Sequence, residues 1–145
     1  MIGVRAISHI GIAVRSIADH RGFYESVLGA RFGGIEDVPS QKVRVAFFLV
    51  GPPGAELRLE LLEPTSPDSP VAGFLEKRGE GVHHLAYAVD GLDTILGRLK
   101  DEGIRLVDEH PREGAHHSRI AFLHPKSTGG VLTELCEQVG PDRAR

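Results

Sequence analysis

The chain has 145 residues, of which 41% are hydrophobic and 26% charged, and its formal net charge is −3. This length is typical of one compact domain, so we do not expect an enzyme with separate cofactor and substrate domains. The acidic balance argues against nucleic-acid binding, which requires a surplus of basic residues to displace counterions. The expected partner is therefore a small molecule or a second copy of the chain, not a nucleic acid or a membrane.

Membrane and export signals are not recognisable in the sequence. The longest uninterrupted apolar run, Val45 to Val50, is far shorter than the roughly 20 residues needed to span a bilayer. The first residues show no export or organelle-import pattern, and the single cysteine, Cys136, fits a reducing compartment. These features predict a cytoplasmic protein.

The chain contains an internal repeat. His9 to Val14 (HIGIAV) is similar to His84 to Val89 (HLAYAV), which lies 75 residues further on, and each segment is expected to form a strand. A helical spacing of apolar residues follows in each copy, over residues 16–28 and 90–102. In the first copy, Ser16 is the expected helix cap.

The second part of each copy repeats as well. Ala46-Phe47 matches Ala121-Phe122, and residues 60–63 (ELLE) match residues 134–137 (ELCE). Each copy therefore predicts the order strand, helix, strand, strand, strand. We expect an α+β fold in which two such modules pair into one curved mixed sheet with the helices outside.

The predicted boundaries are about 5–63 and 80–137 for the two repeats, within a single domain over residues 1–145. A connector at about residues 64–79 joins them. It is expected to carry a short helix, with Pro70 in its first turn and either Asp68 or Ser69 as its cap.

Two histidines and two glutamates recur at equivalent places, His9 with His84 and Glu60 with Glu134. Strand alternation puts each histidine on the face that carries small residues, while the bulky aliphatic residues face a core. The same alternation directs both glutamates away from their leucine neighbours. We expect all four side chains to face the inside of the curved sheet.

Two imidazoles and two carboxylates suit a divalent ion such as Co²⁺, Ni²⁺, Mn²⁺, Fe²⁺ or Zn²⁺. One such residue alone is more often structural, but a symmetric set of four favours a metal site. His83 points to the opposite side of its strand, so His84, which is in register with His9, is the expected ligand. The other histidines are expected to be solvated: His20, His110, His116, His117 and His124.

A resemblance to a known family spans Ile7 to Glu137. It rests on five stretches: His9–Val14, Gln41–Phe47, Glu60–Pro70, Phe74–His84 and Phe122–Cys136. On these residues the chain resembles the vicinal-oxygen-chelate, or glyoxalase-like, superfamily. Residues 60–70 and 124–130 are similar to the methylmalonyl-CoA epimerase family within it.

The resemblance implies that His9, Glu60, His84 and Glu134 are the metal ligands, with Glu60 at a place that is Gln in some members. It implies epimerisation of (R)- and (S)-methylmalonyl-CoA at C2, a homodimer, and no redox or organic cofactor. The divalent ion would stabilise the enolate that forms when the proton leaves C2.

Epimerisation requires proton removal on one face of C2 and delivery on the other. The resemblance suggests Glu134 as both ligand and base. Val45 takes the place of a family glutamate that serves as the opposing acid or base, which leaves a metal-bound water, Glu60 or His116 for that role.

Lys126 and Ser127 are candidates for binding the substrate carboxylate or a CoA phosphate, although the sequence favours a plain turn over a binding role here. Two other functions share the same fold and stay open at this point. One is a glyoxalase-type lactoylglutathione lyase, and the other is a non-catalytic, ligand-sequestering protein of the antibiotic-resistance type.

Overall fold

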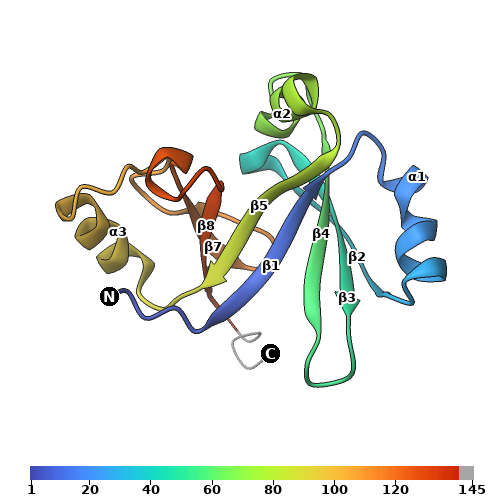
Figure 1. Ribbon diagram of the computed structural model, residues 1–145, viewed down its shortest axis with the longest axis horizontal. Helices are drawn as coiled ribbons and strands as arrows, with labels where there is room; N and C mark the ends of the chain where they lie inside the picture. The colour runs from blue at the N-terminus through green and yellow to red at the C-terminus, as the bar shows by residue number, and fades with distance from the viewer. Residues whose placement is uncertain (141–145) are drawn as a thin grey trace. The chain divides into compact units, whose positions relative to one another are not determined.

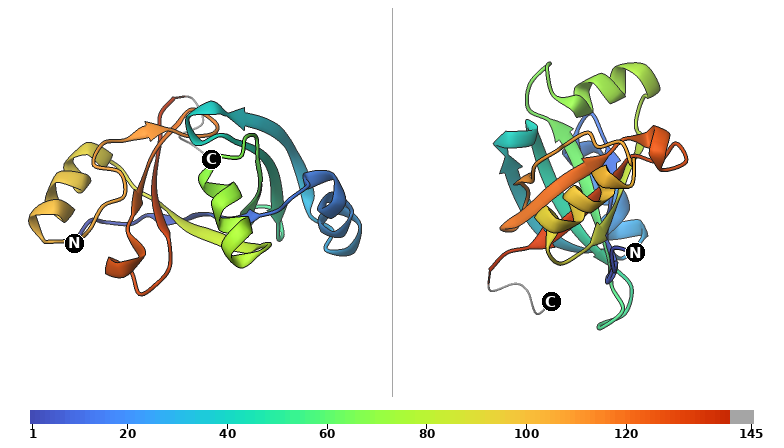
Figure 2. Two further views of the ribbon diagram at one scale, coloured as in Figure 1. Left: turned by 90° about the horizontal axis from the view of Figure 1, so that it is seen from above. Right: turned by 90° about the vertical axis from the view of Figure 1, so that its left-hand side faces the viewer.

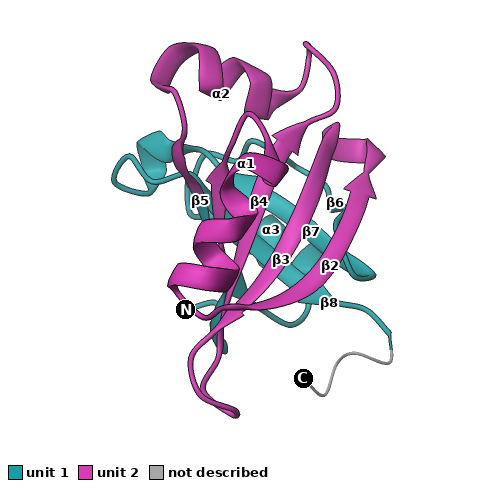
Figure 3. Ribbon diagram, turned by 90° about the vertical axis from the view of Figure 1, so that its right-hand side faces the viewer, with its two compact units in different colours: residues 1–8, 84–145 teal, residues 9–83 magenta. Residues whose placement is uncertain are grey.

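The computed structural model describes residues 1–140. It divides into two compact units (Figure 3). We call residues 9–83 the first half, and residues 1–8 together with 84–140 the second half. Each half has the predicted order of strand, helix, strand, strand, strand, which confirms the mixed α+β class.

The first half supplies four neighbouring strands of the sheet, in the order β2-β3-β4-β1 (Figure 1). Its strands are β1 (Ala6–Ala13), β2 (Arg31–Val38), β3 (Val43–Val50) and β4 (Leu57–Pro64). β2, β3 and β4 form antiparallel pairs, whereas β1 runs parallel to β4. The first and last strands of the module are therefore neighbours.

Helix α1 (Ile17–Gly22) begins as the sequence predicts, because the Ser16 side chain accepts a hydrogen bond from the backbone N–H of Asp19 at 3.3 Å. It then widens into a π-helical turn over Phe23–Val27, which the apolar spacing did not predict. This turn places Tyr24 against Phe48, with ring centroids 5.2 Å apart, so one ring of the widened turn packs on the core of the first half.

The connector forms helix α2 (Pro70–Arg78), followed by strand β5 (Gly81–Ala88). Of the two caps that the sequence left open, Ser69 fills the role, since its hydroxyl accepts a hydrogen bond from the N–H of Val71 at 3.2 Å. Asp68 instead pairs with the ammonium group of Lys42.

The second half repeats the arrangement with the strand order β5-β8-β7-β6. Its other elements are α3 (Leu92–Asp101), β6 (Arg112–Glu113), β7 (Ser118–Leu123), the 3₁₀ turn Pro125–Ser127 and β8 (Thr133–Gln138). β5 and β8 are parallel, and β6, β7 and β8 form antiparallel pairs.

Helix α3 lies across β7 and β8 of its own half (Figure 2). Its apolar residues recur at intervals of three and four and are buried against the sheet: Leu92, Ile95, Leu96 and Leu99. Among residues 1–140, no helix has the length and apolar character needed to cross a membrane.

The last glutamate of each repeated four-residue motif anchors a helix start. Glu63 accepts a hydrogen bond from the N–H of Ile17 at 2.7 Å, and Glu137 accepts one from the N–H of Gly91 at 2.6 Å. A carboxylate at a helix N-terminus satisfies a free backbone donor and interacts favourably with the helix dipole. In each half, a glutamate on the last strand of the repeat thus fixes the start of the helix that follows the first strand.

Candidate metal and active site

In the first half, β1 and β4 bring His9 and Glu60 together. Their parallel register sets Gly11 beside Glu60, and His9 shares a face with Gly11 because it lies two residues before it. Glu60 Oε2 lies 2.9 Å from His9 Nδ1, and the two side chains are only 6% and 5% exposed. The pair is therefore buried.

A third residue, Arg58, joins this pair, and the search for repeated residues missed it. Its Nη2 lies 3.3 Å from His9 Nδ1 and its Nε lies 3.3 Å from Glu60 Oε2. Arg58 precedes Glu60 by two residues and so shares its face of β4, which is the sequence signal that could have revealed it.

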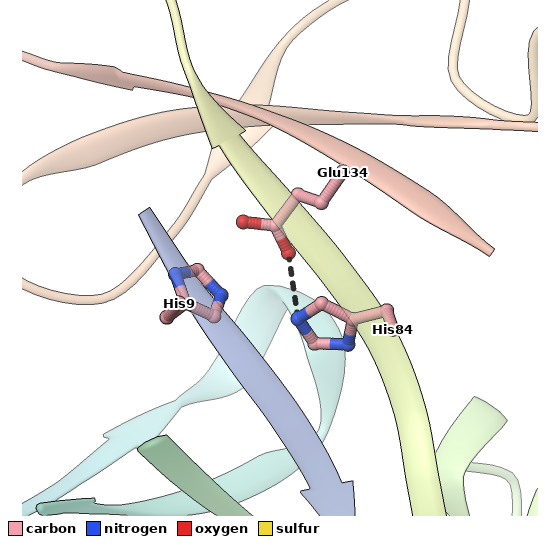
Figure 4. Close-up of side chains that lie close together, drawn as sticks. All are labelled: His9, His84 and Glu134. Carbon is pink, nitrogen blue, oxygen red and sulfur yellow. Dashed lines mark ion pairs between the residues drawn. The ribbon is translucent and has the colours of Figure 1, made fainter. Parts of the chain in front are cut away.

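In the second half, β5 and β8 bring His84 and Glu134 together in the equivalent register, with Ala86 beside Glu134. His84 Nε2 lies 3.2 Å from Glu134 Oε2, as the dashed line in Figure 4 marks. The two side chains are 3% and 4% exposed. Each half therefore holds one buried histidine–glutamate pair.

The surroundings of the second pair are apolar. Phe122 lies directly opposite Glu134 on β7, and its ring meets the His84 ring edge to face at 5.3 Å. Buried Ile120 and Cys136 pack beside Phe122. Hence Glu134 lies opposite a phenylalanine ring whose centre is 5.9 Å from the Arg112 guanidinium carbon, whereas Glu60 Oε2 lies 3.3 Å from a guanidinium nitrogen of Arg58.

The pair distances fit ligands of a single cation. Nitrogen and oxygen ligands bind divalent zinc at about 2.1 Å, so two of them are about 3.0 Å apart at a right angle and about 3.4 Å apart at a tetrahedral angle. The distances within the pairs are 2.9 Å for His9 and Glu60 and 3.2 Å for His84 and Glu134. Two buried carboxylates also need neutralising cations, because uncompensated burial of charge is costly.

His83 has different surroundings from its neighbour His84. Its ring lies 5.0 Å from that of Phe74 on α2, in an edge-to-face contact. Burial lowers the pKa of His83 to about 4, so this imidazole is neutral at pH 7. It is His84 that pairs with Glu134, as the register with His9 predicts.

Two of the histidines that we expected to be solvated have structural partners instead. His20 Nε2 lies 2.7 Å from Glu80 Oε2, and His124 Nδ1 accepts a hydrogen bond from the N–H of Lys126 at 3.1 Å. His124 therefore caps the 3₁₀ turn that follows it. His110 and His117 are exposed as expected.

His116 and His117 lie in the loop before β7, and both have positive φ, at 52° and 55°. Such backbone is unfavourable for residues other than glycine, although histidine adopts it more readily than most. The strand β8 fixes the loop, because Gln138 Nε2 donates to the carbonyl oxygen of His116 and the N–H of Val139 donates to that of His117.

The remaining site candidates are spread over both halves. Val45 is buried on β3 opposite Leu62, so its position offers no titratable group. In the second half, Ser127 Oγ accepts a hydrogen bond from the N–H of Arg105 at 3.0 Å, which gives this hydroxyl a structural role in its turn. Lys126 is exposed beside it.

Comparison with known proteins identifies the family. The model of the Glyoxalase/Bleomycin resistance protein/Dioxygenase superfamily matches residues 8–122. The uncharacterized protein YqjC of Bacillus subtilis is 51% identical over 134 residues, which cover 92% of this chain and 93% of that protein.

Two further relatives have a stated activity. The ethylmalonyl-CoA/methylmalonyl-CoA epimerase of Cereibacter sphaeroides is 39% identical over 141 residues, or 96% of this chain and 100% of that one. A solved methylmalonyl-CoA epimerase in complex with methylmalonyl-CoA and ammonium is 38% identical, with a TM-score of 0.87 over 95% of this chain and 97% of that one. Epimerases are isomerases. The chain belongs to the methylmalonyl-CoA epimerase family, within the glyoxalase superfamily.

Proposed function

We propose that the protein interconverts the (R) and (S) epimers of methylmalonyl-CoA at C2, with the help of a divalent ion. The observation that carries the proposal is the buried histidine–glutamate pair found in equivalent registers of both halves. The activity of the relatives supports the substrate. The proposed ligands are His9, Glu60, His84 and Glu134, the members of the two pairs.

Proton removal from C2 leaves negative charge on the thioester oxygen. A bound divalent ion supplies Lewis-acid stabilisation of that charge. The four ligand side chains would hold it, and their burial keeps water from screening the interaction.

Glu134 is the proposed base for one of the two proton transfers. It contacts His84 and lies opposite Phe122, whereas Glu60 Oε2 lies 2.9 Å from His9 Nδ1 and 3.3 Å from the Arg58 guanidinium. A carboxylate that is already the partner of a guanidinium is a less available proton acceptor, which counts against Glu60 for this role.

The opposing proton transfer requires a different group, because Val45 has no acid–base chemistry. Glu60 and His116 remain the candidates among the side chains, and a water molecule is the third. His116 is partly buried in a loop that β8 fixes through its carbonyl oxygen, so it belongs to an ordered segment.

For the rest of the substrate, we propose that Lys126 binds an anionic group of the CoA moiety. Its exposed ammonium group belongs to a turn that the His124 cap and the Ser127 hydroxyl hold in place. Ser127 contributes through that turn. We further propose that the protein is a homodimer, which sedimentation velocity would test.

The direct test is the incorporation of deuterium at C2 of methylmalonyl-CoA in D₂O, followed by mass spectrometry, with metal content measured on the same sample. The proposal predicts exchange that disappears after chelation and returns on adding a divalent ion. Formation of lactoylglutathione without deuterium exchange would instead support the glyoxalase-type lyase. A metal-free protein that binds its ligand with full affinity but shows no turnover would support the sequestering protein.

A further inference from the structure

The two histidine–glutamate pairs are equivalent, but the residue two positions before each glutamate is not. That residue is Arg58 in the first half and Leu132 in the second. Leu132 packs against an apolar cluster, while Arg58 contacts both members of its own pair. The second half has its own guanidinium, that of Arg112, 5.9 Å from the centre of the Phe122 ring, but the strand position that carries Arg58 in the first half carries leucine in the second.

The guanidinium of Arg58 faces electron-pair donors. Its nitrogens lie 3.3 Å from His9 Nδ1 and 3.3 Å from Glu60 Oε2, and those two atoms are 2.9 Å apart. A neutral imidazole nitrogen cannot donate to Glu60 and accept from Arg58 at the same time. With Nδ1 as an acceptor, both atoms direct lone pairs at the guanidinium, as they would at a metal ion.

Arg58 is also accessible from outside the pair. Its side chain is 25% exposed, compared with 6% for that of Glu60. The guanidinium carbon lies 5.9 Å from the centre of the Phe47 ring, which is directly opposite Glu60 on β3. Arg58 thus extends from the surface past the Phe47 ring to the buried carboxylate of Glu60.

The acyl group of the proposed substrate carries a carboxylate next to the reacting carbon, and propionyl-CoA is the same thioester without it. Once Glu60 serves as a metal ligand, its charge no longer requires the guanidinium, which becomes available for another anion. Arginine matches a carboxylate with two parallel hydrogen bonds.

We propose that Arg58 binds the carboxylate of the acyl group and so makes the site specific for malonyl-type thioesters. This inference rests on the proposed function. In the protein without substrate, Arg58 neutralises Glu60, and in the complex it contacts the substrate. The side chain therefore acts as a specificity-determining residue at the proposed site.

The test measures the binding of methylmalonyl-CoA and propionyl-CoA to the metal-loaded protein by isothermal titration calorimetry. We expect Arg58→Met to weaken methylmalonyl-CoA binding about tenfold or more, the effect of a lost charge-assisted hydrogen bond, and to leave propionyl-CoA binding unchanged. Arg58→Lys should recover part of the loss. Arg44→Met is the matched control, because Arg44 is an arginine on β3 that pairs with exposed Asp37.

A second measurement tests whether Arg58 acts by binding the substrate or by holding Glu60 in place as a metal ligand. Metal affinity, determined by competition with a chromophoric chelator, should stay the same or rise in Arg58→Met, because a competing cation is removed. Equal weakening of both thioesters, or a fall in metal affinity in step with it, would overturn the inference. If the parent protein shows no deuterium exchange at C2, the proposed function fails, independently of any effect of Arg58.

Discussion

The two halves build the same pair of side chains in different electrostatic surroundings. In the first half, Glu60 Oε2 lies 2.9 Å from His9 Nδ1 and 3.3 Å from the Arg58 guanidinium. In the second half, Glu134 contacts His84 and lies in an apolar cluster around Phe122. Strand pairing therefore determines which residues meet, while the side chain two positions before each glutamate differs, being Arg58 in the first half and Leu132 in the second.

The largest expected effect separates the two glutamates. Glu134→Gln should lower kcat for epimerisation by about 10²–10⁴-fold, because it removes a positioned base. Glu60→Gln should cost roughly tenfold or less, because the amide oxygen still offers a lone pair. Steady-state rates of the two variants give the comparison, with thermal unfolding as the folding control. Equal losses would show that the halves do not differ in this way.

The next prediction concerns adjacent histidines on β5. His84→Ala should weaken metal binding by at least about tenfold, since it removes a proposed ligand, while His83→Ala should retain most of the metal. Mass spectrometric metal analysis after dialysis measures both. Loss of metal in His83→Ala and its retention in His84→Ala would mean that the assigned register is off by one residue.

A smaller effect, on stability, is expected at the two glutamates that accept hydrogen bonds from the starts of α1 and α3, Glu63 and Glu137. Removing a carboxylate cap costs about 1 kcal/mol of unfolding free energy, so Glu63→Ala and Glu137→Ala should both be destabilised by this order. Glu137→Ala should lose more unfolding free energy than Glu63→Ala, because Glu137 also lies 3.2 Å from a guanidinium nitrogen of Arg119. Urea denaturation measures the difference. A larger loss in Glu63→Ala would contradict the comparison.

The smallest expected effect is on the pH dependence of stability, through hydrogen bonds that the Glu80 carboxylate accepts within the first half. Hydrogen bonds from the N–H of Arg15 and from His20 lower the pKa of Glu80 below its ordinary value of 4.5. A lowered carboxyl pKa stabilises the fold above pH 4.5, and this stabilisation is lost as the pH falls through the lowered value.

Glu80→Gln should therefore unfold at lower urea than the parent at pH 7, and the two midpoints should converge in acid. Glu76→Gln is a suitable control, because Glu76 is an exposed glutamate on α2. A difference between parent and Glu80→Gln that stays constant down to low pH would show that the carboxylate charge is not the cause.

The repeat and strand alternation predicted most of the fold and the composition of both pairs. An offset of 74 or 75 residues aligned the histidines with each other and the glutamates with each other, and the period of two placed each on the face where the structure has it. The helix cap at Ser16 was also predictable, because its chemistry is local.

Other features depend on contacts that a sequence pattern does not encode. The π-helical turn over Phe23–Val27 forms where Tyr24 packs on Phe48, a residue 24 positions away. Arg58 corresponds to Leu132 in the second copy, so the repeat gives no signal for it. His124 looked like an ordinary surface histidine, and only the backbone of the following turn shows that it is a cap.

The presence of Arg58 in the first half has a consequence for synthesis on the ribosome. The first module is translated through β4 before His84 exists, so its buried carboxylate must be compensated by groups already made. Arg58 and His9 both precede Glu60 in the chain and contact it within that module. The nascent first module therefore has an internal counter-charge for Glu60, and its folding need not wait for the later ligands.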